Sequence, residues 1–230
     1  ASDRTIIAHF LGTAANGIYS IANKFPNVFI QFYNILNLSW TETVSLHYGD
    51  EDRDEFLTET MTSLFKLFAA ACFGIVACMP FVFPILINEK YVAGYDQILI
   101  LMYAMLFRVL VGLYSCIYVA QKNAKKIAYT SISAAIINIT VNLILINKIK
   151  IFAASISTLV AFFSMFIIRY IDVNKTVHMR IRKPIIIGSI LIGTMLIGTY
   201  YCENKMIQLI ALCITAIYAV LTNVDMLKSG

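Results

Sequence analysis

Residues 67–88 read LFAAACFGIVACMPFVFPILIN, a run that contains no charged residue. A helix needs about 20 mostly apolar residues to cross the hydrocarbon core of a bilayer, which is roughly 30 Å thick. Further uncharged runs of similar length lie at 127–147, 151–168, 184–202 and 206–224. Because backbone polar groups inside a bilayer must be paired internally, these runs predict helices. The fold expected is an all-α, polytopic transmembrane helix bundle.

The composition excludes several classes of protein. Of the 230 residues, 60% are hydrophobic and 13% are charged, whereas a soluble domain is about half apolar and roughly one quarter charged. A soluble enzyme, a disordered chain and a disulfide scaffold are therefore disfavoured. The cysteines and histidines match no metal-ligand spacing, and no catalytic motif occurs. We accordingly predict no metal, no cofactor and no enzymatic activity.

Seven spans are expected from these runs and the apolar stretches beside them. They lie at about 17–46, 58–87, 97–120, 126–147, 151–171, 184–201 and 206–223. Residues 5–16 resemble the tail of an earlier span. We therefore divide the chain into a transmembrane lobe at 1–171 and a second part at 172–230, which holds a basic loop and two additional helices.

Lysine and arginine residues predict the orientation. Of the 18 such residues, ten fall in the loops after the first, third and fifth spans and in the tail, five fall on the opposite side, and three lie within spans. The positive-inside rule places the richer side, with the C-terminus, in the cytoplasm. The cluster at 169–183 is expected to contact anionic lipid headgroups. Nothing in the charge pattern requires nucleic acid as a partner.

A polar stripe runs along the first predicted span. Its members fall at steps of three and four residues, which places most of them on one helix face: Asn16, Ser20, Asn23, Asn27, Gln31, Asn34 and Thr41. Lys24 lies beside the stripe, and Pro26 interrupts the helix. The amides either hold neighbouring helices together or line an aqueous cavity. We favour the cavity, because so many polar positions exceed what helix packing needs.

Three cations lie within the predicted spans: Lys24, Lys66 and Arg108. A cation at mid-membrane costs about 2.5–3.5 kcal/mol, and no acidic residue lies one turn from Lys24 or Arg108. An anionic cargo would offset this cost, and a lipid-linked sugar diphosphate is one candidate. Lys66 can instead snorkel, or pair with Glu59 or Glu42. The expected substrate-binding residues are Lys24, Arg108, Asn23, Asn27, Gln31 and Lys66.

Small and amide residues recur on the fourth and fifth predicted spans. Asn138 and Asn142 are one turn apart, and Ser157, Ala161 and Ser164 share a face of the next span. Residues of these types usually let helices approach closely. We expect these two faces to serve helix packing rather than to line a cavity.

Several short motifs resemble segments of a known family. Leu11-Gly12 and the stretch Gly17 to Lys24 resemble the LG…GxYsxAxK segment of bacterial polysaccharide flippases, and Asp3-Arg4 ahead of it is also typical. Ile117 to Lys122, and Asn138 with Asn142-Leu143-Ile144-Leu145, resemble two later family segments. These flippases, which include the O-antigen transporters, belong to the multidrug/oligosaccharidyl-lipid/polysaccharide exporter superfamily.

The resemblance implies a function. Such proteins have two lobes of helices, and this chain would supply the C-terminal lobe and two extra helices, with the missing N-terminal lobe as a partner. They reside in the bacterial cytoplasmic membrane and flip undecaprenyl-diphosphate-linked oligosaccharides by alternating access, for surface polysaccharide and lipopolysaccharide biosynthesis. The resemblance implies that Lys24 and Arg108 take part in binding this anionic substrate.

Three alternatives remain open. A cation-coupled multidrug exporter of the same superfamily would need carboxylates inside the membrane. Only Glu42 and Glu59 are considered close to the spans, and both lie near helix ends, so this alternative ranks lower. A membrane enzyme of polysaccharide assembly, such as a polymerase or ligase, would need a long outer loop. A membrane scaffold without transport activity is the third.

Overall fold

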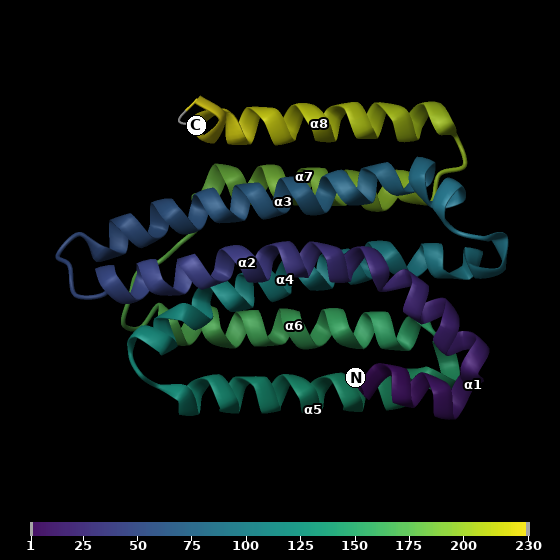
Figure 1. The fold of residues 1–230 in the computed structure, drawn as a ribbon, viewed down its shortest axis with the longest axis horizontal. Coiled ribbons are helices and arrows are strands. Elements are labelled where there is room, and N and C mark those ends of the chain that lie inside the picture. Colours follow the sequence, from purple (N-terminus) through teal and green to yellow (C-terminus); the bar gives the residue numbers. More distant parts are fainter. Residues whose placement is uncertain (1, 229–230) are drawn as a thin grey trace. The chain divides into compact units, whose positions relative to one another are not determined.

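The computed structural model describes residues 2–228, and it describes side chains for residues 3–224. The described residues form helices and connecting turns without a strand (Figure 1). The elements are α1 (Ser2–Ala22), α2 (Lys24–His47), α3 (Arg53–Leu86), the short 3-10 helix η1 (Glu89–Gly94), α4 (Tyr95–Ala120), α5 (Ala124–Ile149), α6 (Phe152–Val173), α7 (Lys183–Tyr200) and α8 (Lys205–Lys228). The predicted all-α polytopic bundle is confirmed. Lys228, which we counted on the cytoplasmic side, and residues 229–230 lie outside the described side chains.

Six helical segments among the described residues are long and apolar enough to cross a membrane. They correspond to the six predicted spans from residue 58 onward, and to α3, α4 with η1, α5, α6, α7 and α8. Six candidate spans in one chain indicate a multi-pass membrane protein.

The first predicted span, 17–46, is not one continuous helix. α1 ends at Ala22 and α2 begins at Lys24. The break has a local cause, because Pro26 has no N–H to donate to the carbonyl of Ala22 four residues earlier. α1 is also kinked at Gly12, whose φ of 86° is a left-handed conformation that glycine adopts without a Cβ clash.

The chain separates into two compact units. The first comprises Ala1–Gly49 with Ile87–Thr176, and the second comprises Asp50–Leu86 with Val177–Gly230. The second unit therefore groups α3 with α7 and α8, although our division along the sequence put residues 53–86 in the lobe at 1–171. The role of that lobe stays a prediction.

In the first unit, α4 packs against both α2 and α6, and α5 packs against α6. Its core consists of large side chains of α4 with almost no exposure, such as Leu101, Met102 and Leu113. The α5–α6 contact includes polar bonds, since Asn138 Nδ2 donates to Ser157 Oγ and Thr158 Oγ1 at 3.4 and 3.3 Å. The two faces therefore pack helices together as expected, but the expectation that they line no cavity is wrong, because Asn138 and Ala161 also line a cavity of about 300 Å³.

In the second unit, the extended segment 177–182 lies along α3. Val177, Met179 and Ile181 are buried. The alternate residues donate from their backbone N–H groups to α3 side chains one turn apart, at 2.9, 3.4 and 3.3 Å: His178 to Asp54, Arg180 to Thr58, and Arg182 to Thr62.

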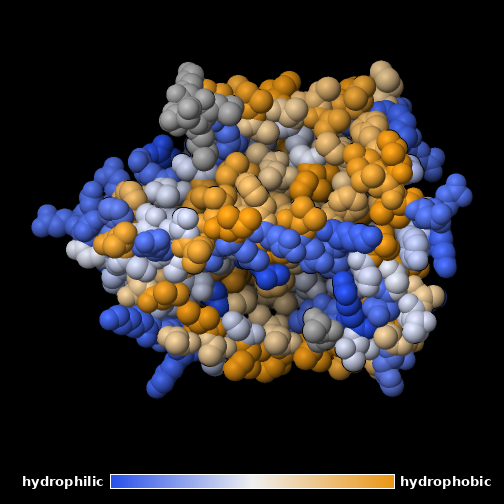
Figure 2. Space-filling view, in the orientation of Figure 1, coloured by the Kyte–Doolittle hydropathy of each residue, from blue (hydrophilic) through white to orange (hydrophobic). Residues whose placement is uncertain are grey.

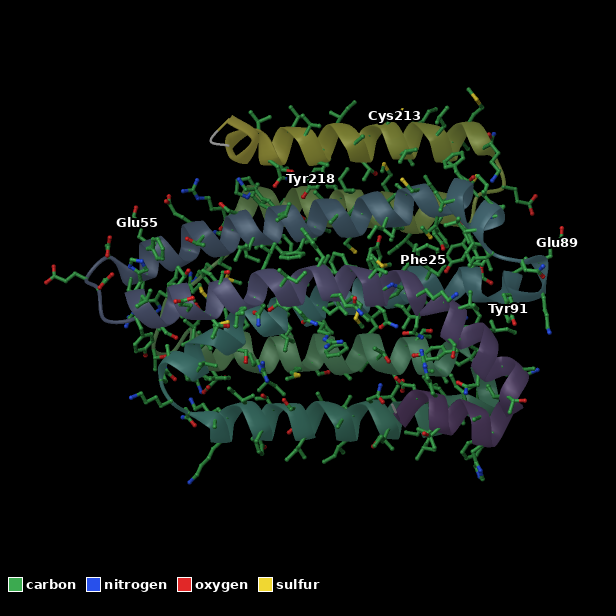
Figure 3. All side chains as sticks on the ribbon, viewed as in Figure 1. Phe25, Glu55, Glu89, Tyr91, Cys213 and Tyr218 are labelled. Carbon is green, nitrogen blue, oxygen red and sulfur yellow. The ribbon has the colours of Figure 1, made fainter. Side chains whose placement is uncertain are left out.

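Helices α7 and α8 are joined by a polar contact and carry apolar outer faces. Tyr218 of α8, labelled in Figure 3, has its hydroxyl 2.8 Å from Ser189 Oγ of α7. Around this contact, large apolar residues such as Ile190, Leu191 and Ile217 are exposed. Exposed isoleucine and leucine on a helix suit contact with acyl chains, which agrees with a position in the bilayer.

Candidate functional site

A polar cavity of about 300 Å³ lies within the first unit, between α2, α4, α5 and α6. Its polar lining residues are Tyr33, Asn37, Thr41, Arg108, Ser115, Ser131 and Arg169. In Figure 2 the surface is hollowed beside the row of hydrophilic residues that follows α2. Because four helices contribute to it, the cavity is a product of tertiary packing and of no single motif.

Arg108 lies midway along α4 and lines this cavity with Gly112 and Ser115. Its guanidinium carbon stands 5.9 Å from the centre of the Phe162 ring, a cation–π contact from α6. No hydrogen bond or ion pair ties this guanidinium to another described residue. A guanidinium has five N–H donors, so Arg108 presents free donors to whatever occupies the cavity.

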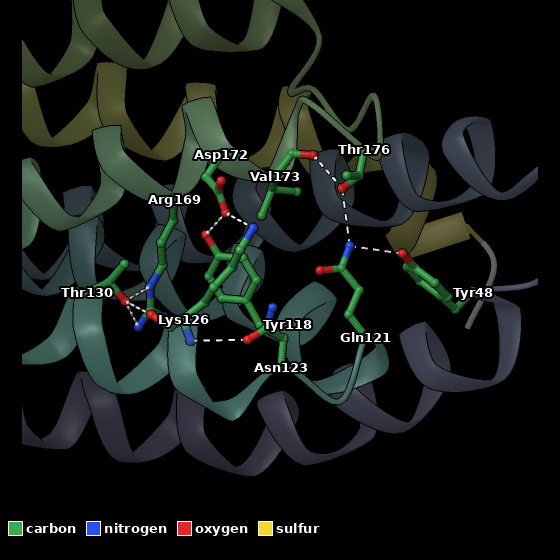
Figure 4. Close-up of polar contacts among 10 residues, drawn as sticks. All are labelled: Tyr48, Tyr118, Gln121, Asn123, Lys126, Thr130, Arg169, Asp172, Val173 and Thr176. Carbon is green, nitrogen blue, oxygen red and sulfur yellow. Dashed lines mark hydrogen bonds and ion pairs between the residues drawn. The ribbon is translucent and has the colours of Figure 1, made fainter.

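Arg169 is the second cation of the cavity, and the sequence-based assignment of this residue was wrong. We placed it in the basic cluster at 169–183 that contacts lipid headgroups, but it lies on α6 with 2% exposure. Its Nε and Nη2 donate to Thr130 Oγ1 at 3.1 and 2.9 Å (Figure 4). Its Nη2 also donates to Ser131 Oγ at 3.4 Å, and its Nη1 donates to the Val111 carbonyl at 3.1 Å.

The carboxylate nearest in sequence to Arg169 is already engaged by other groups. Asp172 Oδ2 accepts from Lys126 Nζ at 2.6 Å and from the Tyr118 hydroxyl at 2.8 Å (Figure 4). Arg169 therefore makes only neutral hydrogen bonds and a 5.9 Å contact with the Tyr118 ring. A buried cation without a counter-charge is costly unless a ligand supplies one.

The charge of the cavity favours an anion. Its lining includes Arg108 and Arg169, and no acidic residue of the described part of the chain lines it. Arginine forks match the oxygens of phosphate and carboxylate groups, and such bonds are strongest where water is excluded. The hydroxyls of Ser115 and Ser131, and the amide of Asn37, add groups that bind neutral hydroxyls. This set suits a ligand with a phosphate and a sugar.

Tyr33 and Asn37 line the cavity although we did not select them from the sequence. The Tyr33 hydroxyl donates to Asn37 Oδ1 at 2.6 Å, and Tyr33 packs directly over Gly112, where a Cβ would collide with its ring and hydroxyl. Thr41, a member of the predicted stripe, lies on the same face, 3.2 Å from Cys116 Sγ. The signal was present in the steps of four from 33 to 37 to 41.

The other predicted residues are not brought into this cavity. Lys24, Asn27 and Gln31 lie on the exposed face of α2. Asn23 is half-buried at the break before α2 and donates to the Tyr19 carbonyl at 2.8 Å. It stays a prediction that this exposed face lines a water-filled cavity.

Lys66 lies half-buried on α3, in the second unit. Its ammonium makes no ion pair with another described residue. Glu59, one partner that we considered, instead accepts from Arg182 at 2.6 Å. A role for Lys66 in substrate binding gains no support from its contacts.

Asp3 supplies a carboxylate among the helices that we did not count from the sequence. Its Oδ1 accepts from Asn142 Nδ2 and its Oδ2 from Thr158 Oγ1, both at 3.1 Å. Asn142 is fully buried, and its Oδ1 has no hydrogen-bond partner. A second cavity of about 300 Å³ is lined by Asp3, Asn138 and Thr158 among others. A carboxylate beside unpaired oxygen acceptors suits a small cation or a proton.

Comparisons of this chain with protein-family models, curated proteins and solved structures identify no match. Membership of the flippase superfamily therefore stays a prediction from the motifs.

Proposed function

We propose that this chain is the cargo-binding part of a transporter that moves an anionic, lipid-linked oligosaccharide across a membrane. The observation that carries the proposal is the cavity that holds Arg108 and Arg169 without a carboxylate. Two arginines at one cavity fit a diphosphate, and the neighbouring hydroxyl and amide groups fit sugar hydroxyls. The motifs quoted above point to an undecaprenyl-diphosphate carrier and to alternating access with a further lobe.

The proposal includes a location. The bias of lysine and arginine toward the loops after alternate spans favours a cytoplasmic C-terminus. The resemblance to polysaccharide flippases points to the bacterial cytoplasmic membrane. Surface polysaccharide biosynthesis is the process that such a transporter serves.

The test uses membrane vesicles that contain the full-length protein and a fluorescent lipid-linked sugar diphosphate. We expect Arg108→Gln and Arg169→Gln each to lower the initial rate of translocation at least tenfold, since a hydrogen bond to a charged group contributes about 1.5–3 kcal/mol. Arg180→Gln is the matched control, because Arg180 is exposed and lies outside the cavity lining. Translocation at the control rate in both cavity variants, with equal protein levels, would remove the basis of the proposal.

Asp3 favours a second candidate function, which is cation-coupled export. Its carboxylate pairs with no cationic side chain in the described part of the chain, while the Asn142 oxygen beside it lacks a donor. We expect Asp3→Asn to abolish the dependence of transport on a sodium or proton gradient. Arg108→Gln should leave that dependence intact while lowering the rate. Unchanged gradient dependence in Asp3→Asn would exclude this candidate.

A further inference from the structure

We propose that the groove between α5 and α6, where α5 begins and α6 ends, binds an anionic phospholipid of the bilayer. The groove is a cavity of about 540 Å³, separate from the cavity that contains Arg108. It is lined by residues of α4, α5 and α6 and by Lys175, which follows α6. The inference does not rest on the transport function proposed above.

The charged end of the groove is positive. Lys125, Lys126 and Lys175 line it, and Asp172 is the only acidic lining residue among those that the structure describes. Lys126 is held by Asp172 at 2.6 Å and lies 5.5 Å from the centre of the Tyr118 ring (Figure 4). The exposed side chains of Lys125 and Lys175 make no hydrogen bond with a described residue. Lys175 acts on the charge of Asp172 without forming an ion pair, so its ammonium and that of Lys125 can both bind a phosphate, from opposite sides of the groove.

The rest of the groove is apolar and faces outward. One turn farther into the helices lie Tyr129, Ile168 and Ile171, which are 71%, 36% and 55% exposed. A lipid has a charged head followed by an apolar chain, which is the order of the lysines and apolar side chains in this groove. The arrangement of the lining therefore matches the arrangement of one lipid molecule.

The position of the groove agrees with a lipid occupant. α5 and α6 are both candidate membrane spans, and the lysines lie at the first turn of α5 and just after the last turn of α6. The charged end is then at the level of the headgroups, whichever way the chain is oriented. Basic pockets between transmembrane helices at this level bind anionic headgroups. A zwitterionic lipid also carries a phosphate, but its choline group brings a positive charge next to the lysines, so the positive groove favours a lipid with net negative charge.

The experiment is native mass spectrometry of the purified full-length protein with phosphatidylglycerol or with phosphatidylcholine of matched acyl chains. We expect wild-type protein to retain one phosphatidylglycerol in preference to phosphatidylcholine. Lys125→Gln/Lys175→Gln should weaken this retention about 30-fold, since each lysine near an anionic lipid contributes a factor of about five. The control is Lys148→Gln/Lys150→Gln, which removes two exposed lysines at the other end of α5 and should retain the lipid.

A second variant separates the groove from charge alone. Ile171→Trp keeps every lysine and fills the apolar part, so it should also lose the lipid. Ile171 is more than half exposed, so the fold should tolerate the change. Trp40 fluorescence checks folding in the lysine variants, and far-ultraviolet circular dichroism checks it in Ile171→Trp, which has a second tryptophan. Retention equal to wild type in Ile171→Trp or in Lys125→Gln/Lys175→Gln would overturn the proposal. Displacement of the lipid by millimolar glycerol phosphate would also overturn it, because it would show a site for free phosphate.

Discussion

Replacing Arg169 with methionine tests whether this arginine serves the ligand or the fold. In the folded protein its guanidinium makes four hydrogen bonds of 2.9–3.4 Å, two to Thr130, one to Ser131 Oγ and one to the Val111 carbonyl. Each such bond to a charged group contributes about 1.5–3 kcal/mol. Against this stands the desolvation of a cation that is 2% exposed and has no carboxylate partner, which costs several kcal/mol. The two contributions nearly cancel.

The partners of Arg169 tolerate its removal. The Thr130 hydroxyl also lies 2.9 Å from the Lys126 carbonyl and 3.1 Å from that of Ile127, so it retains acceptors. Methionine is unbranched and flexible enough to occupy the space of the arginine stem. We therefore expect the free energy of unfolding of Arg169→Met to equal that of wild type or to exceed it by up to about 2 kcal/mol.

Ligand binding should respond in the opposite direction. Losing one charged contact to a phosphate should weaken binding of a short prenyl diphosphate at least tenfold, since a factor of ten corresponds to about 1.4 kcal/mol. Unfolding is followed in detergent by the fluorescence of Trp40, the one tryptophan of the chain, which is buried and donates to the Leu113 carbonyl at 3.2 Å. Arg180→Met is the control. A stability loss above about 3 kcal/mol with prenyl diphosphate binding intact would mean that Arg169 is structural, against this reasoning.

Three further substitutions test the local structure around these sites, the first two with the Trp40 unfolding assay and the third by circular dichroism. Gly112→Ala places a methyl group against the Tyr33 ring and should lower the unfolding free energy by about 1–3 kcal/mol; an unchanged value would show that Tyr33 moves freely. Asn142→Leu removes a donor from the Asp3 carboxylate and should cost about 1–3 kcal/mol, with recovery in Asp3→Asn/Asn142→Leu; no recovery would mean that packing alone explains the loss. Pro26→Ala restores an N–H at the break before α2 and should raise the helical circular dichroism signal slightly; an unchanged signal would show that another feature causes the break.

The class of fold was predictable from the sequence because it depends on local properties. Apolar runs such as 184–201 specify membrane helices by length and composition alone, and α7 at Lys183–Tyr200 follows that run closely. The extent of the first helix was not predictable to the same degree. A proline can bend a helix or end it, and the sequence of Pro26 and its neighbours does not distinguish the two outcomes.

The candidate site was only partly predictable, because a site depends on how helices are rotated against one another. Arg108 stood out, since it is the single charge in an otherwise apolar span of 97–120. Lys24 stood out for a similar reason, yet it lies on the exposed face of α2 and not in the cavity lined by Arg108. Composition identifies a costly charge, but it does not give the direction in which the side chain points.

Arg169 is a buried cation that could not be identified as a cavity residue from the sequence. Near the end of a span, an arginine can extend to the headgroups at little cost, and the basic residues that follow it strengthened that interpretation. The spacing of Arg169 from the buried residues before it contradicts the headgroup interpretation, but this spacing can be interpreted only once the packing of α6 is known. Ala161, Met165 and Arg169 recur every four residues, and all three are buried on one face of α6. Because that face packs on α4 and α5, the last cation of the span is directed inward, toward the same cavity as Arg108.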